Sequence, residues 1–103
     1  MQEVIVMYKL KQGVTIREYR KWSLEVDQKI TPHQEGVHKF EVYEVKGAEK
    51  GEPSCQIVED IEVESWQRWQ EVLKGKGMEK VMRDWGKYGD ADSVVAIWAE
   101  KIE

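Results

Sequence analysis

The chain has 103 residues, of which 41% are hydrophobic and 35% are charged, and its formal net charge at neutral pH is −4. This length suits one domain with a single core, and the hydrophobic fraction excludes an intrinsically disordered chain. The acidic balance, with lysines interleaved among glutamates, excludes the basic surface typical of nucleic-acid-binding domains. We therefore expect residues 1–103 to form one domain that binds no nucleic acid.

Six segments of strand-like or helix-like periodicity fill almost the whole chain. Their order is strand, helix, strand, strand, helix, strand. Two such β-α-β halves build a four-stranded antiparallel sheet with both helices on one face, which is an α+β fold. The predicted segments are, in chain order, Met1–Lys11, Ile16–Ile30, Val37–Lys46, Ser54–Glu64, Trp66–Tyr88 and Ser93–Ile102.

Local signals explain where the predicted elements begin and end. Thr15-x-x-Glu18 has the pattern of a capping box at the start of the first helix, and Thr31-Pro32 ends that helix. Residues 47–53 form a polar turn between the two central strands. Ser65 is a suitable cap for the second helix, in which Gly75 predicts a break.

The single cysteine, Cys55, excludes an internal disulfide and suits a reducing compartment. Met1 leads directly into strand-like residues, so we expect neither a signal peptide nor a membrane-spanning segment. These features predict a cytoplasmic protein that does not bind membranes.

The first and last strands are apolar on both faces, which indicates that both faces of the sheet are buried. The two helices cover only one face. A second copy of the sheet is the simplest cover for the other, so the sequence predicts a homodimer that associates through its sheet faces. In the first strand one face carries Val4, Val6 and Tyr8 and the other carries Ile5 and Met7. In the last strand one face carries Val94, Ala96 and Trp98 and the other carries Val95, Ile97 and Ala99.

Asp27 is the first candidate catalytic residue, because helical spacing places it with Ser23 and Tyr19 inside the apolar arc of the first helix. A carboxylate that faces a core is costly unless it is paired, and such positions are enriched in function. Asp27 is therefore a candidate general base, with Tyr19 and Ser23 as hydrogen-bonding neighbours. The alternative is a frayed helix end at which Asp27 bonds to loop amides or to Lys29.

His38 is the second candidate, since strict alternation places it with Phe40 and Val42 on one face of its strand, toward the helices. There it could meet Asp27 and form an acid/base pair. A structural core or edge histidine is the alternative. Together with His33, Asp27 and Glu59 it could in principle form a metal site, but the ligand spacing is absent and we expect no metal.

Glu59 lies between Ile57 and Ile61 on an otherwise apolar strand face. It could be a pocket residue, but we favour an ion pair with Lys9 or Lys39. Five tryptophans and four tyrosines supply aromatic walls suited to flat organic ligands. The expected substrate-binding residues are Tyr8, Trp22, Ser23, Phe40 and Trp66.

Several stretches of the chain resemble the REDY-like family. They are the run Tyr8-Lys9-Leu10-Lys11-Gln12-Gly13-Val14, then Glu18-Tyr19-x-x-Trp22, Asp27, and Val37-x-x-Phe40-x-Val42-Tyr43. That family belongs with the dimeric α/β-barrel proteins of ferredoxin-like fold, beside EthD-type proteins and cofactor-free monooxygenases of antibiotic biosynthesis. The resemblance implies this fold and a setting in secondary metabolism. EthD-type relatives carry a histidine soon after the first helix, where this chain has His33.

Two functions are consistent with these residues. The first is a small cofactor-independent enzyme that acts on a hydrophobic or aromatic metabolite by proton transfer or oxygenation, with Tyr19, Asp27 and His38 in its pocket. The alternative is a non-catalytic binding or accessory protein that uses the same pocket. No phosphate-binding loop or dinucleotide fingerprint is present, so no cofactor is expected.

Overall fold

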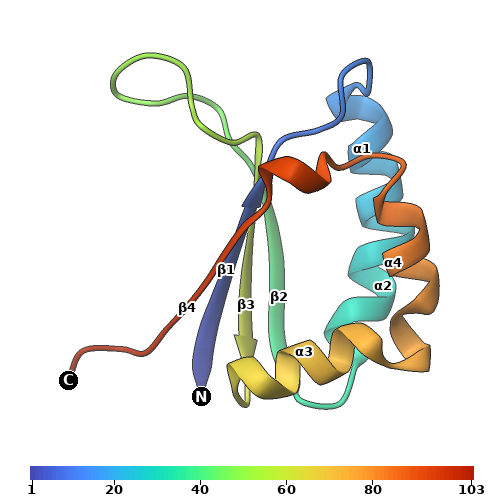
Figure 1. Cartoon of the computed structure of the whole chain (residues 1–103), viewed down its shortest axis with the longest axis vertical. Coiled ribbons are helices and arrows are strands. Elements are labelled where there is room, and N and C mark those ends of the chain that lie inside the picture. The colour runs from blue at the N-terminus through green and yellow to red at the C-terminus, as the bar shows by residue number, and fades with distance from the viewer.

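The computed structural model describes residues 1–103 and has the predicted order of elements (Figure 1). The strands are β1 (Gln2–Tyr8), β2 (Val37–Glu44), β3 (Ile57–Val63) and β4 (Val95–Ala99). All neighbouring pairs are antiparallel, in the order β2-β3-β1-β4. The helices all lie on one side of this sheet. The predicted α+β, ferredoxin-like architecture is confirmed.

The first predicted helix changes its winding along its length. It begins as α1 (Ile16–Trp22), which is capped by the expected Thr15–Glu18 box, and continues as a π-helical turn over Ser23–Asp27. The chain then forms the short α2 (Gln28–Ile30) and a 3₁₀ turn at Thr31–His33. The Gln28 N–H donates to the Ser23 carbonyl, which is the wider bonding pattern of a π turn.

The second helix is divided near Gly75, as predicted. It consists of α3 (Trp66–Lys74), a 3₁₀ turn at Lys76–Met78 and α4 (Glu79–Trp85). Ser65 caps α3 by accepting a hydrogen bond from the Arg68 N–H. None of the helices has the length and apolarity needed to span a bilayer.

The core lies between the helices and one face of the sheet. Strand alternation places Val4, Ile61 and Val63 there, with almost no exposed surface. α1 contributes Tyr19 and Trp22, and the α3–α4 segment contributes apolar side chains to the same cluster: Trp69, Val72, Met78 and Val81. The helices and one face of the sheet thus share one hydrophobic cluster.

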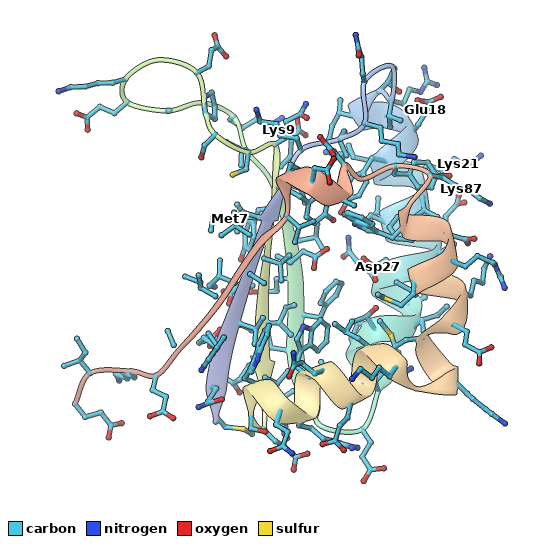
Figure 2. All side chains as sticks on the ribbon, viewed as in Figure 1. Met7, Lys9, Glu18, Lys21, Asp27 and Lys87 are labelled. Carbon is cyan, nitrogen blue, oxygen red and sulfur yellow. The ribbon has the colours of Figure 1, made fainter.

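The other side of the sheet, which we call the open face, has no covering element. Figure 2 shows Met7 on this side, away from the helices. On β4 the open face exposes about half of the Val95 and Ile97 side chains. Lys39 also lies here, 3.1 Å from Asp60 and 3.5 Å from Glu3. The apolar members of the open face are Ile5, Met7, Tyr43, Val58, Val95 and Ile97.

β2 departs from simple alternation at His38. Val37 pairs with Val63 and Lys39 pairs with the adjacent Glu62, so His38 is an extra residue in a β-bulge. As a result Val37 and Phe40, three positions apart, both point into the core, while His38 is exposed. The expectation that His38 shares the inward face with Phe40 and Val42 is therefore wrong.

Candidate functional site

A cavity of about 200 Å³ lies between the sheet and the helices. We call it the carboxylate cavity, because Asp27 and Glu59 are its two acidic lining residues. Most of its other lining residues are apolar, and the aromatic ones come from strands and from both halves of the second helix. These aromatic residues are Tyr8, Phe40, Trp66, Trp69 and Trp85.

Glu59 is placed in the cavity by strand alternation. It lies on β3, an inner strand, paired with Val6 of β1 and Val42 of β2. Only 7% of its surface is exposed, and one oxygen, Oε2, accepts a hydrogen bond of 2.7 Å from the Tyr8 hydroxyl. Burial raises the pKa of Glu59 to about 8, and the negative charge of Asp27 contributes to the increase. At neutral pH this carboxyl is therefore mainly protonated.

The Tyr8 and Tyr19 hydroxyls extend this contact into a chain. They lie 2.6 Å apart, and both side chains are almost fully buried. When Tyr8 donates its proton to Glu59, the Tyr8 oxygen accepts a hydrogen bond from the Tyr19 hydroxyl. Burial raises the pKa of both phenols above the usual tyrosine value, so both remain protonated donors. The chain therefore runs from Tyr19 through Tyr8 to Glu59.

Asp27 reaches the cavity from the end of the π-helical turn. Figure 2 shows it in the space between the helices and the sheet. It is 3% exposed and accepts a hydrogen bond of 2.6 Å from the Thr31 hydroxyl. Burial raises the pKa of Asp27 to about 6, although the bond from Thr31 opposes the increase. Single π turns are frequent at functional sites, and this turn orients both Ser23 and Asp27 inward.

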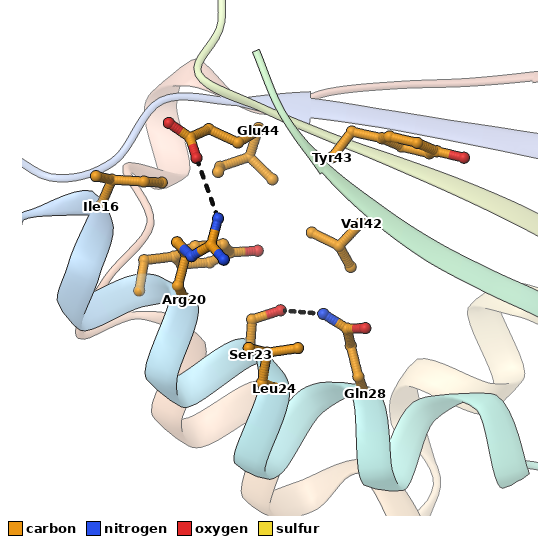
Figure 3. Close-up of a pocket in the computed structure, with 10 residues that line it drawn as sticks. Ile16, Arg20, Ser23, Leu24, Gln28, Val42, Tyr43 and Glu44 are labelled. Atoms are coloured by element: carbon orange, nitrogen blue, oxygen red, sulfur yellow. Dashed lines mark hydrogen bonds and ion pairs between the residues drawn. The ribbon is translucent and has the colours of Figure 1, made fainter. Parts of the chain in front are cut away.

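A second cavity of about 180 Å³ lies between the first helix and the β2 edge of the sheet (Figure 3). We call it the edge cavity. Its polar contacts are the Arg20–Glu44 ion pair at 3.5 Å and a 3.0 Å bond from the Gln28 amide to the Ser23 hydroxyl. Tyr19 lines this cavity, and its hydroxyl touches Tyr8, which lines the carboxylate cavity.

The structure brings together four of the residues expected at the site. Asp27, Tyr8, Phe40 and Trp66 all line the carboxylate cavity, and Tyr19 contacts it through the Tyr8 hydroxyl.

Three other predicted site residues lie elsewhere. Ser23 lines the edge cavity. Trp22 borders neither cavity and stacks on Tyr88, with ring centroids 5.3 Å apart. His38 is exposed at the bulge, and Asp27 is hydrogen-bonded to Thr31 instead, so the predicted Asp27–His38 pair is wrong.

Thr31 is a site residue that the sequence did not indicate, and Glu59 is one for which the less favoured alternative, a pocket residue, is the one that the structure has. The favoured ion pair of Glu59 with Lys9 or Lys39 is wrong, because Glu59 bonds to the Tyr8 hydroxyl and forms no ion pair within the chain, while Lys39 pairs with Asp60 on the open face. The apolar neighbours Ile57 and Ile61 were the available signal for a buried Glu59. Thr31 lies four residues after Asp27, but the sequence did not indicate their contact, because Thr31-Pro32 was interpreted only as the end of the first helix.

The two layers and the strand order define the chain as a small α+β domain of ferredoxin-like fold. A family model described as REDY-like protein HapK matches residues 2–102, so the chain belongs to this family. Comparison with curated protein sequences finds no match.

Solved structures support the same fold assignment. HapK from Hahella chejuensis superposes with a TM-score of 0.80 at 14% identity, covering 99% of this chain and 93% of that one. An EthD family protein from Bacillus halodurans gives 0.76 at 14% identity, with 99% of both chains covered. A dimeric protein of unknown function and ferredoxin-like fold from Bacteroides fragilis gives 0.71 at 14% identity, covering 97% and 95%. At these identities the likeness establishes the fold alone.

Proposed function

We propose that the chain is a small cofactor-independent enzyme that transfers a proton on a flat, apolar or aromatic molecule bound in the carboxylate cavity. The observation that carries this proposal is a buried carboxyl, Glu59, with a pKa of about 8 on an aromatic-walled cavity. A general acid or base is most effective when its pKa lies near the working pH. Environments that move two carboxyls to different pKa values are typical of acid/base sites.

Each polar side chain of the cavity has a role in this scheme. Glu59 accepts or returns the proton. Tyr8 holds Glu59 through the 2.7 Å bond and is itself fixed by Tyr19. Asp27 is a positioning residue, since its charge raises the pKa of Glu59. The walls are mostly apolar, and apolar surroundings strengthen these electrostatic effects.

The exchange of carbon-bound hydrogen tests the proposal. We expect the protein at pH 8 to accelerate exchange of the α-hydrogens of phenylacetone with D2O, measured by NMR, by about 10²-fold over buffer. Glu59→Gln should return the rate to that of buffer, because an amide cannot accept the proton. The exposed carboxylate Glu25 supplies the control, Glu25→Gln, which should match the wild type. Equal rates for Glu59→Gln and wild type would contradict the role of Glu59.

A non-catalytic binding protein is the second candidate. One observation favours it: the Tyr8 and Thr31 hydroxyls, both in the cavity, already donate to carboxylates. Neither is free to stabilise charge that develops on a substrate. Binding of phenylacetone by the wild type without any accelerated exchange would support this candidate over the enzyme.

We also propose that two copies associate through the open face. The apolar side chains of this face are left without cover, and exposed apolar patches mark interaction surfaces. Structurally similar proteins from Bacteroides fragilis and Thermobifida fusca are described as dimeric. The free thiol of Cys55 fits the cytoplasmic setting that we propose, and the family fits a place in secondary metabolism.

Ile97→Lys is expected to convert the dimer to a monomer. Ile97 pairs with Ile5 on the open face, and a lysine there would place a charge inside the interface at a cost of several kcal/mol. Sedimentation should give twice the 12.1 kDa chain mass for the wild type and the single mass for the variant. Leu24→Lys, a matched change at an exposed apolar side chain on the helical side, should remain dimeric. A dimeric Ile97→Lys would argue against this interface.

A further inference from the structure

The carboxylate cavity has an unbalanced set of charges. Its ionisable lining residues are Asp27, Glu59 and Tyr8, and no lysine, arginine or histidine lines it. The one further titratable group in contact with them is the Tyr19 phenol. Both carboxyls are more than nine-tenths buried. Two buried acids without a basic partner are costly when ionised, unless a cation enters the same space.

Each carboxyl also has one oxygen that the protein leaves without a hydrogen bond. Tyr8 donates to Oε2 of Glu59, and no donor of the protein bonds to Oε1. Thr31 donates to Oδ1 of Asp27, and Oδ2 has no donor. Because both side chains line the cavity, these oxygens are available to a ligand there. Carboxylate oxygens can only accept hydrogen bonds when they are ionised, so a ligand with N–H donors fits them.

The walls of the cavity favour a positive charge as well. Indole and phenol rings attract cations over their faces, and tryptophan is the strongest of these partners. Three tryptophans line the cavity, namely Trp66, Trp69 and Trp85. The volume of about 200 Å³ compares with the roughly 150 Å³ apolar cavity that holds benzene. A single ring with a short side chain therefore matches the available space.

We propose that the ligand is a small aromatic or heteroaromatic amine, bound as a cation with its charged nitrogen on the carboxylates of Asp27 and Glu59. This inference rests on the proposed function and specifies its substrate class. The ammonium ion supplies the missing counter-charge, and the ring occupies the aromatic walls. Its arrival also ionises Glu59, because a nearby positive charge favours the carboxylate. Binding thus releases a proton and leaves Glu59 ionised beside the bound cation.

Three probes that share a phenyl ring and differ in charge test this proposal. They are phenethylamine, phenethyl alcohol and hydrocinnamate, which are a cation, a neutral molecule and an anion. Calorimetry at pH 7 in phosphate and in Tris gives both the affinity and the number of protons exchanged. We expect the amine to bind at least about tenfold more tightly than the other two and to release close to one proton.

Two variants test whether Glu59 causes the preference for the amine and the release of the proton. Glu59→Gln should remove most of the preference for the amine and most of the proton release, while binding of the alcohol is retained. Glu25→Gln, which removes an exposed carboxylate, should bind all three probes as the wild type does. Binding of the alcohol as tight as that of the amine would overturn the amine proposal and leave the proposed cavity function standing. Failure of all three probes to bind would overturn the proposed function itself.

Discussion

Replacing Glu59 with glutamine is expected to stabilise the protein strongly at alkaline pH. The folded state raises the pKa of this carboxyl from 4.5 to about 8, so the folded protein binds a proton that the unfolded chain releases. The resulting stability is fully present below pH 4.5 and is lost as the pH rises through 8. For one buried group this loss is on the order of 4 kcal/mol. A glutamine side chain cannot ionise, so the variant avoids this loss.

Urea unfolding at pH 5, 7 and 9 measures this effect. Near pH 5 the free energies of unfolding of wild type and Glu59→Gln should be similar, since both side chains are neutral there. At pH 9 the variant should be the more stable protein by several kcal/mol. Asp27 also titrates in this range, but it is present in both proteins. Parallel pH profiles for the two proteins would show that Glu59 does not hold the proton.

Element order and strand faces could be predicted from sequence because they depend on local periodicity. Alternation along the predicted Ser54–Glu64 strand correctly grouped Ile57, Glu59 and Ile61 on one face, and the Thr15–Glu18 box marked the start of α1. The same alternation oriented Glu59 inward. The favoured ion pair with Lys39 is wrong because Lys39 follows the same alternation: Phe40 faces the core, so the adjacent Lys39 lies on the open face, where it pairs with Asp60.

The contacts that complete the site depend on irregular backbone that no periodic pattern reveals. A bulge at His38 turns that side chain away from the core, and it is an irregularity in the pairing of β2 with β3. The π turn at Ser23–Asp27 arises within a normal helical pattern. Helical spacing could also identify Trp22 and Trp66 as inward-facing, but it could not separate a core side chain from a cavity wall.

Trp22→Ala is expected to destabilise the protein by roughly 3–5 kcal/mol, the usual cost of deleting a buried tryptophan. Trp22 is 5% exposed, stacks on Tyr88 and lies 6.0 Å from the Tyr19 ring. It borders neither cavity. Affinity for phenethylamine, measured by calorimetry well below the melting temperature, should therefore change little. Trp22→Phe keeps an aromatic ring on Tyr88 and should recover most of the stability.

Trp66→Ala should give the opposite result, and the pair of variants separates packing from recognition. Trp66 is half-buried, lines the carboxylate cavity and stacks on Trp98 at 4.5 Å, where that partner is itself 52% exposed. Removing the Trp66 ring removes less buried apolar surface than removing the Trp22 ring, but it takes away one wall of the cavity. We expect a smaller loss of stability and a clear loss of phenethylamine affinity. If Trp22→Ala weakens binding while Trp66→Ala does not, the ligand lies under the first helix and the site must be reassigned there.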